Sequence, residues 1–387
     1  MLADVLRLFF ALSCFLISLL AVFKAPTNTL WLLSIAVTEY GHLVFWTPLL
    51  AVLPTEKRGN WGRATIAFAA LASLLFLSPL MRALPLAVNL TSDLENAFGE
   101  NRLTPEKLAG LGRSAPISAF DLFGFVDTPE ISFQTIPFDS ADGQILTFDL
   151  YSPQNQTQPA PCVLVIHGGA WRGGNSQQLP ELNRYLAGQG YVVASISYRL
   201  APRWQFPAQI DDVESAFRKL KSNAAQYDID STKFVFIGGS AGGHLAMLAG
   251  YTFDDPAIRG VVSFYGPADL HFGYANPANP AVINTHEVLE NFLGGSPREV
   301  FETYEAASPI KHVGHKTPPT LLLHGGRDEL VSFRQSGRLG AVLKDAGTPH
   351  LYLAMPWATH GFDFKLSGPG GQLSTFAVEY FLTAVFN

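Results

Sequence analysis

Cysteine is scarce in this sequence, and its scarcity limits the kinds of fold open to the chain. Only two cysteines occur among 387 residues, Cys14 within an apolar run and Cys162 at the start of a strand-like segment. Two cysteines in such different surroundings do not form a disulfide, because the bridge needs Cα atoms within about 7 Å of each other. A disulfide-stapled fold is excluded, and the cysteines leave the cellular compartment open.

Runs of basic residues and internal repeats are also absent. Residues 91–387 hold 20 Lys and Arg against 29 Asp and Glu, whereas residues 1–90 hold six against three. Because nucleic-acid binding draws most of its affinity from cations that neutralise phosphates, we exclude nucleic acid as a partner. The change of charge sign near residue 90 predicts two parts in different solvents.

Long apolar runs fill the first part. Residues 8–23, 30–53 and 64–81 each approach the ~20 residues that cross a bilayer core, so we predict a membrane anchor of about three transmembrane helices over residues 1–90. The first run resembles a signal peptide, but the bulky, charged Val22-Phe23-Lys24 lacks a small-x-small cleavage site. An uncleaved anchor is the favoured interpretation.

The side of the membrane follows from the loop charges. Lys57, Arg58 and Arg63 make the strongest positive cluster and are expected to stay cytoplasmic. The rest of the chain is then expected on the extracytoplasmic, periplasmic or lumenal side.

Two ionisable residues lie within the second apolar run. Glu39 and His42 are three positions apart and share one helical face, and such groups at membrane depth raise the hypothesis of a functional site. A polar contact between anchor helices is the favoured interpretation, and binding or passage of a substrate is the alternative.

From residue 131 onward, short β-rich runs alternate with helical stretches, which is typical of a sheet covered by helices on both faces. Residues 91–130, interrupted by prolines, are interpreted as a connector that covers part of the active site. Residues 269–310 are too long for an ordinary connection and are expected to form a lid or pocket insertion. The expected strands are 131–138, 145–151, 162–167, 191–198, 233–238, 260–265, 320–324 and 351–355, and the expected helices are 177–189, 207–226, 240–252, 332–346 and 371–386.

The most informative motif is a strand that runs into Gly238-x-Ser240-x-Gly242 and then into an apolar helix. This is the context of a nucleophile elbow, where a strained turn lifts the serine hydroxyl above the sheet. Gly238 and Gly242 are expected because a side chain there would meet the neighbouring strand and helix. We predict Ser240 as a nucleophile.

A serine hydroxyl needs a base, and the base needs an orienting acid. Asp328 follows a predicted strand and a Gly-Gly turn, and His360 lies in the loop after the last strand, so the chain order is Ser240, Asp328, His360. Glu329 and Asp269 are alternatives for the acid, and Asp328 is preferred.

Ester hydrolysis also needs hydrogen-bond donors for the oxyanion. A glycine-rich turn after the strand at 162–167 would present the amides of Gly169 and Ala170, with Gly168 as a further candidate, and Ala241 follows the nucleophile. His167, directly before the turn, is interpreted as structural.

These motifs resemble the hormone-sensitive-lipase-like esterases of the α/β-hydrolase superfamily over about residues 135–387. The segments that carry the resemblance are His167-Gly-Gly-Ala-Trp171, Tyr198-Arg-Leu-Ala-Pro202, Phe206-Pro-Ala208, Gly239-Ser-Ala-Gly-Gly-His244 and His360-Gly-Phe362. The resemblance implies an α/β-hydrolase fold over residues 131–387, with an eight-stranded, mostly parallel sheet, and hydrolysis through an acyl-enzyme. The turn ends Gly-Gly-Ala-Trp where the esterases usually have a third glycine, a variant similar to kynurenine formamidases and prenylcysteine methylesterases.

The sequence therefore predicts a membrane-anchored serine carboxylester hydrolase that acts on lipophilic or acylated esters. Its acyl pocket is expected between the insertion at 269–310 and the connector at 91–130. No metal or organic cofactor is implied, and the oligomeric state stays open. The alternatives are an amide hydrolase of the same fold and a catalytically silent binding protein.

Overall fold

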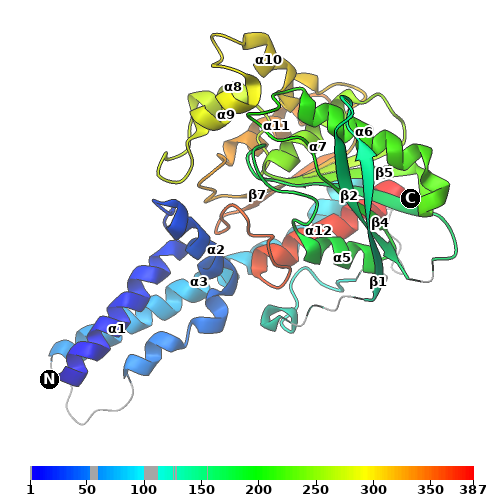
Figure 1. Cartoon of the computed structure of the whole chain (residues 1–387). Coiled ribbons are helices and arrows are strands. Elements are labelled where there is room, and N and C mark those ends of the chain that lie inside the picture. Colours follow the sequence, from blue (N-terminus) through cyan, green and yellow to red (C-terminus); the bar gives the residue numbers. More distant parts are fainter. Residues whose placement is uncertain (1, 53–59, 100–111, 125, 127–128, 155) are drawn as a thin grey trace.

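The structure is a computed structural model that describes residues 2–52, 60–99, 112–124, 126, 129–154 and 156–387. One eight-stranded sheet forms its centre (Figure 1). All eight expected strands are confirmed. They are β1 (Ile131–Asp139), β2 (Ile145–Pro153), β3 (Ala160–Ile166), β4 (Val192–Ile196), β5 (Ile229–Gly239), β6 (Ile258–Phe264), β7 (Thr320–Gly325) and β8 (His350–Met355).

The strands run in the spatial order β1-β2-β4-β3-β5-β6-β7-β8. Pairing is antiparallel between β1 and β2 and between β2 and β4, and it is parallel from β4 through to β8. The parallel strands are continuous apolar runs because helices bury both of their faces. In β3, Leu164 and Ile166 enter one core, while Val163 and Val165 enter the other.

Helices cover both faces of the sheet, and all five expected helices are confirmed. One face carries α6 (Ala208–Ser222), α7 (Ala241–Thr252) and α11 (Arg334–Asp345), and the other carries α5 (Pro180–Gly188) and α12 (Pro369–Phe386) (Figure 1). The expected insertion is also helical. It comprises α8 (Leu270–Ala275), α9 (Thr285–Leu293), α10 (Phe301–Ala306) and η5 (Pro309–His312).

The N-terminal helices form an arm that projects from the sheet domain (Figure 1). The arm contains α1 (Leu2–Ser18), η1 (Leu19–Ala21), α2 (Asn28–Val44), η2 (Thr47–Val52) and the first half of α3 (Asn60–Phe98). Among the described residues, two helices are long and apolar enough to cross a membrane, Leu2–Ala21 and Trp61–Phe98. The first overlaps the predicted span 8–23 as far as Ala21, and the second contains the predicted span 64–81.

The prediction of one continuous span over residues 30–53 is wrong. Helix α2 ends at Val44 after 17 residues, and the chain continues as the separate 3-10 helix η2, in which Pro48 supplies no backbone N–H. A 17-residue helix is at the short limit for crossing a bilayer core. The described residues therefore hold two helices of membrane-spanning length and hydropathy, where three were predicted.

Helix α3 joins the arm to the sheet domain without a break at residue 90. Its last turns bury Leu90, Leu94 and Phe98 in the same core as α5 and α12. The Phe98 ring packs edge-on against Phe381 of α12, with ring centroids 4.9 Å apart. The end of this helix is thus part of the core of the sheet domain.

Glu39 and His42 contact the sheet domain and its connector, which corrects the favoured interpretation of a contact between anchor helices. The Glu39 carboxylate accepts hydrogen bonds from the amides of Gly370 and Gly371 at the start of α12. The His42 ring lies 2.9 Å from the Leu122 carbonyl oxygen, measured from Nε2. Both side chains therefore hold α2 against neighbouring parts of the chain.

The described part of the connector lies along α12. Arg113 donates from its backbone amide to Glu379, and Ser118 donates to the Gln372 side chain at 2.7 Å. Residues 100–111, where more of the connector was expected to fold, lie outside the described residues. The residues around Arg113 and Ser118 thus brace α12.

Candidate active site

Ser240 lies between β5 and α7, in the turn that the sequence predicts. Its backbone has φ 56° and ψ −120°, a strained conformation for a residue other than glycine. A Cβ at Gly242 would collide with the carbonyl oxygen of Ile166 in β3, and one at Gly238 would collide with the Gly242 carbonyl group. The two glycines are therefore required by contacts with the neighbouring strand and helix, as predicted.

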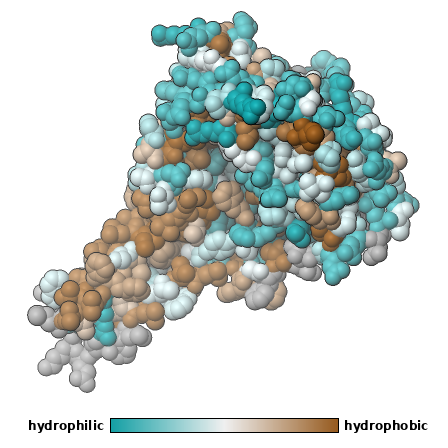
Figure 2. All heavy atoms as spheres, viewed as in Figure 1, coloured by the Kyte–Doolittle hydropathy of each residue, from teal (hydrophilic) through white to brown (hydrophobic). Residues whose placement is uncertain are grey.

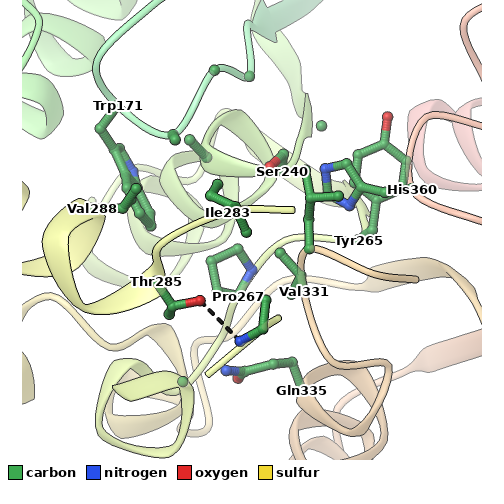
Figure 3. A pocket seen from close by; sticks show the side chains of 18 of the residues that line it. Trp171, Ser240, Tyr265, Pro267, Ile283, Thr285, Val288, Val331, Gln335 and His360 are labelled. Atoms are coloured by element: carbon green, nitrogen blue, oxygen red, sulfur yellow. Dashed lines mark hydrogen bonds between the residues drawn. The ribbon is translucent and has the colours of Figure 1, made fainter. Parts of the chain in front are cut away.

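Ser240 opens onto a cavity of about 360 Å³ that His360 also lines (Figure 3). One side of the cavity is formed by the turn at Gly168–Arg172, and another by the insertion. The insertion contributes apolar side chains, namely Leu270, Ile283, Val288 and Leu289.

Asp328 and His360 are in direct contact at the end of the sheet. His360 Nδ1 lies 2.6 Å from Asp328 Oδ2, and the amides of Leu330 and Val331 donate to Asp328 Oδ1 at 2.8 and 2.7 Å. Burial alone would raise the pKa of Asp328, but the His360 charge and hydrogen bonds from His324 and His360 outweigh it. The pKa of Asp328 is therefore held well below its usual range.

The two alternative acids have other partners. Glu329 accepts from the Ala25 amide and from the Thr359 hydroxyl. Asp269 caps helix α8 by accepting from the Phe272 amide at 2.9 Å. Of the three carboxylates that the sequence offered, Asp328 is the one whose side chain contacts His360.

The turn after β3 has an unusual backbone that exposes amide groups. Gly169, Ala170 and Trp171 have consecutive positive φ angles of 116°, 54° and 55°. Ala241 is the first residue of α7, where backbone N–H groups have no acceptor within the helix. The Gly168 amide donates instead to the Gln178 side chain at 2.5 Å, so it is occupied.

Two buried histidines hold this turn in place. Burial lowers the pKa of His167 to about 4, and its Nδ1 faces the Gly168 carbonyl oxygen at 2.7 Å. His167 also stacks on Tyr198, whose hydroxyl donates back to the His167 carbonyl oxygen. The structural role predicted for His167 agrees with these contacts.

His244, on α7, links the turn to the insertion. Its Nε2 lies 2.6 Å from the Ala307 carbonyl oxygen, and its Nδ1 accepts from Trp171 Nε1 at 3.2 Å. Burial lowers the pKa of His244 to about 4, so the ring is neutral near pH 7 with its proton on Nε2. His244 thus holds the Trp171 side chain against Ala307, near the end of the insertion.

Sequence reasoning missed a Tyr–Asp pair beside the histidine. The Tyr265 ring lies 4.1 Å from the His360 ring between centroids, and its hydroxyl donates to Asp363. Burial raises the pKa of Asp363 to about 6. Two signals were available, because Asp363 follows His360-Gly-Phe and Tyr265 is the last residue of the strand predicted at 260–265.

The cavity wall differs in part from the predicted one. The insertion lines it, as expected, but among the described residues of 91–130 none does. Asn28 and Trp31, which belong to the N-terminal region, line the cavity instead. The segment expected to be a remote anchor thus reaches the site.

A mostly parallel eight-stranded sheet with a serine on the elbow after β5, and with Asp328 and His360 after later strands, defines an α/β-hydrolase fold. The chain belongs to the BD-FAE family of these hydrolases, whose family model matches residues 148–343.

Proteins that are similar to this chain in sequence are named as esterases or carboxylic ester hydrolases. The probable carboxylic ester hydrolase LipM of Mycobacterium tuberculosis is 30% identical over 92% of this chain and 86% of LipM. The esterase LipQ of the same organism is 35% identical, but the match covers 59% of this chain and 56% of LipQ. The prediction of a carboxylic ester hydrolase agrees with these names.

Solved structures support the fold. An esterase from the archaeon Pyrobaculum calidifontis superimposes with a TM-score of 0.60 at 21% identity, covering 79% of this chain and 97% of the esterase. A truncated carbohydrate esterase from gut microbiota superimposes with a TM-score of 0.51 at 26% identity, covering 66% of this chain and 99% of that one.

Proposed function

We propose that this chain is a membrane-anchored serine carboxylester hydrolase in which Ser240 is the nucleophile, His360 the base and Asp328 the orienting acid. The observation that carries the proposal is the 2.6 Å contact between His360 and Asp328, at the cavity onto which the strained Ser240 turn opens. The esterase names of the relatives support the reaction class.

The proposed reaction proceeds in two halves. His360 accepts the Ser240 hydroxyl proton as Oγ attacks the ester carbonyl carbon, and Asp328 stabilises the imidazolium that forms. His360 then gives this proton to the departing alkoxide, so an alcohol leaves and Ser240 carries the acyl group. Water, deprotonated by His360, attacks the acyl group, and the Ser240 oxygen leaves with the proton that His360 returns.

The oxyanion of each tetrahedral intermediate would accept hydrogen bonds from the amides of Gly169, Ala170 and Ala241. These amides project from rigid backbone, so they stabilise the developing charge without reorganisation. The Gly168 amide is not one of the proposed oxyanion donors, because it donates to the Gln178 side chain.

The proposed substrate is a lipophilic or acylated ester. A cavity of about 360 Å³ with apolar side chains from α8 and α9 can hold an acyl chain beside Ser240. An arm in the bilayer would also raise the local concentration of lipophilic esters.

The surface of the arm supports the membrane part of the proposal. Figure 2 shows that hydrophobic residues dominate the described atoms of the arm on the face in view. Soluble monomers rarely expose apolar patches of this extent. The exposed residues on α1 and α3 include Leu6, Phe9, Leu16, Trp61, Leu74, Met81 and Val88.

We further propose that the far end of the arm is cytoplasmic and that the sheet domain is extracytoplasmic. Arg7 lies in the second turn of α1 and Arg63 in the first turn of α3, and both helices begin at that far end (Figure 1). Lys57 and Arg58, which were expected on the same side, lie outside the described residues. Positive charge on the cytoplasmic side would fix this orientation.

An ester panel tests the function. The full-length protein in detergent micelles would be given p-nitrophenyl esters of increasing acyl length, with the Ser240→Ala variant as the control. Turnover that rises with acyl length and vanishes in the variant is expected. Turnover restricted to short acyl groups would contradict the lipophilic substrate, and faster cleavage of matched amides would favour an amide hydrolase.

A further inference from the structure

Residues 20–31, which we call the junction segment, run from η1 into the first turn of α2 and lie against the sheet domain at the base of the arm (Figure 1). The segment contacts three regions that are remote in sequence. These are the loop of the proposed acid, the loop of the proposed base and the insertion over the cavity.

The first contact is with the loop that carries Asp328. Here four hydrogen bonds join the junction segment to residues 327–329. They run from Arg327 Nη1 to the Leu20 carbonyl oxygen (2.7 Å), from Arg327 Nη2 to the Phe23 carbonyl oxygen, from Lys24 Nζ to the Asp328 carbonyl oxygen (2.5 Å) and from the Ala25 amide to Glu329 Oε1 (3.0 Å).

The second contact is with the loop of His360. Trp31 Nε1 donates to the His360 carbonyl oxygen at 2.9 Å, and the two rings lie 6.1 Å apart between centroids at 60°. Thr27 caps the start of α2 by accepting from the Leu30 amide. The cap fixes the first turn of α2 and with it the position of the Trp31 indole.

The third contact is with the insertion. The backbone N–H of Asn28 donates to the Ala281 carbonyl oxygen at 3.1 Å, and the side-chain Nδ2 of Asn279 donates to the Pro26 carbonyl oxygen at 3.0 Å. Asn28 and Trp31 line the same cavity as Ser240 and His360. The junction segment is therefore both a support of the catalytic loops and a part of the cavity wall.

We propose that Trp31 serves the active site in two ways, as a positioning residue for His360 through its indole N–H and as a substrate-contacting wall of the cavity through its ring. The proposal rests on the proposed function and extends it to the arm. The helical arm is then a working part of the active site rather than a tether alone.

The two roles are separable by substitution, because phenylalanine keeps an aromatic ring but has no N–H. Trp31→Phe removes the hydrogen bond to His360, and its loss is expected to lower kcat about fivefold for short and long esters alike. Trp31→Ala also removes the wall. It is expected to raise KM about tenfold for long acyl esters and little for acetate.

Trp46, just beyond the end of α2, offers a matched control. Its indole also donates to a carbonyl oxygen, that of Leu43 at 2.9 Å, but it does not line the cavity. Trp46→Phe makes the same chemical change in the arm, so its kcat and KM are expected to equal those of the wild type.

The experiment measures kcat and KM for acetate and long-chain p-nitrophenyl esters with the four full-length proteins, and thermal unfolding of each in the same detergent. Lower kcat in Trp31→Phe, with a length-dependent KM change that appears in Trp31→Ala alone, would support both roles. Trp31 variants that match Trp46→Phe in kcat and KM would overturn the proposal, as would losses of activity that follow the loss of folded protein.

The outcome is distinguishable from a failure of the proposed function. Wild-type turnover that disappears in Ser240→Ala supports the hydrolase whatever the Trp31 variants do. Absent turnover by folded wild-type protein would contradict the hydrolase and this extension together.

Discussion

Glu39, on helix α2 of the arm, caps helix α12 of the sheet domain. Its Oε2 accepts hydrogen bonds from the Gly370 amide at 2.8 Å and from the Gly371 amide at 3.3 Å. The N-terminus of a helix carries unpaired N–H groups, and the buried side-chain oxygen of Glu39 accepts from two of them. Through this pair the arm and the final helix stabilise one another.

Removal of this cap is expected to destabilise the protein. Glu39→Ala should lower the free energy of unfolding by about 1–2 kcal/mol, and Glu39→Gln should lose less because its amide oxygen still accepts a hydrogen bond. Thermal unfolding in detergent measures both variants. Glu302→Ala, at an exposed site on α10, is the control, and a Glu39→Ala variant as stable as this control would contradict the capping role.

The neighbouring carboxylates Asp328 and Glu329 give a paired test of the acid. Asp328→Asn is expected to lower kcat about 10⁴-fold, because the amide no longer fixes the productive tautomer of the base. Glu329→Gln, which changes a side chain bonded to Ala25 and Thr359, is expected to keep kcat within about threefold on the scale of one neutral hydrogen bond. The opposite order of effects would assign the role to Glu329.

Asp363 predicts a dependence of stability on pH. Burial raises its pKa to about 6 in the folded protein, against about 3.9 in an unfolded chain. The folded state then binds the proton more tightly, so ionisation of Asp363 destabilises the protein as the pH rises from about 4 to about 6.

Asp363→Asn cannot ionise, but its side-chain oxygen still accepts from Tyr265. Its stability relative to the wild type is therefore expected to rise with pH across this window and to level off above it. Denaturant unfolding at a series of pH values gives the difference. The exposed Asp254→Asn serves as the reference, and a difference for Asp363→Asn that is flat or falls with pH would contradict the assignment.

The proposed orientation of the arm predicts which cysteines a membrane-impermeant maleimide labels in intact cells. With Cys14 and Cys162 replaced by alanine, Glu302→Cys on the sheet domain is expected to react. Lys57→Cys is expected to react only after permeabilisation. The reverse pattern would invert the topology, and release of the protein by alkaline carbonate would contradict membrane anchoring.

Local motifs in the sequence were sufficient to predict the fold and most of the candidate site. The turn at Ser240 is recognisable because only glycine avoids a collision with the adjacent backbone at two of its positions. The strands are recognisable because buried parallel strands are short apolar runs. Asp328 and His360 follow strands, and parallel strands bring their ends to one edge of the sheet.

Contacts between segments far apart in the chain could not be predicted from the sequence. Trp31 and His360 are joined by one hydrogen bond across most of the chain, and nothing in the residues around either one signals the other. Apolar runs in the arm predicted helices but not the docking of their polar residues. The occupation of the Gly168 amide by Gln178 likewise depends on how two loops fold together.

The central claim is that Ser240 is an activated nucleophile, and active-site labelling tests it most directly. Folded full-length protein would be treated with a fluorophosphonate, digested and analysed by mass spectrometry. The account predicts one phosphonylated peptide containing Ser240, no labelling of Ser240→Ala, and much slower labelling of Asp328→Asn. Folded protein that stays unlabelled, or a label on another serine, would contradict it.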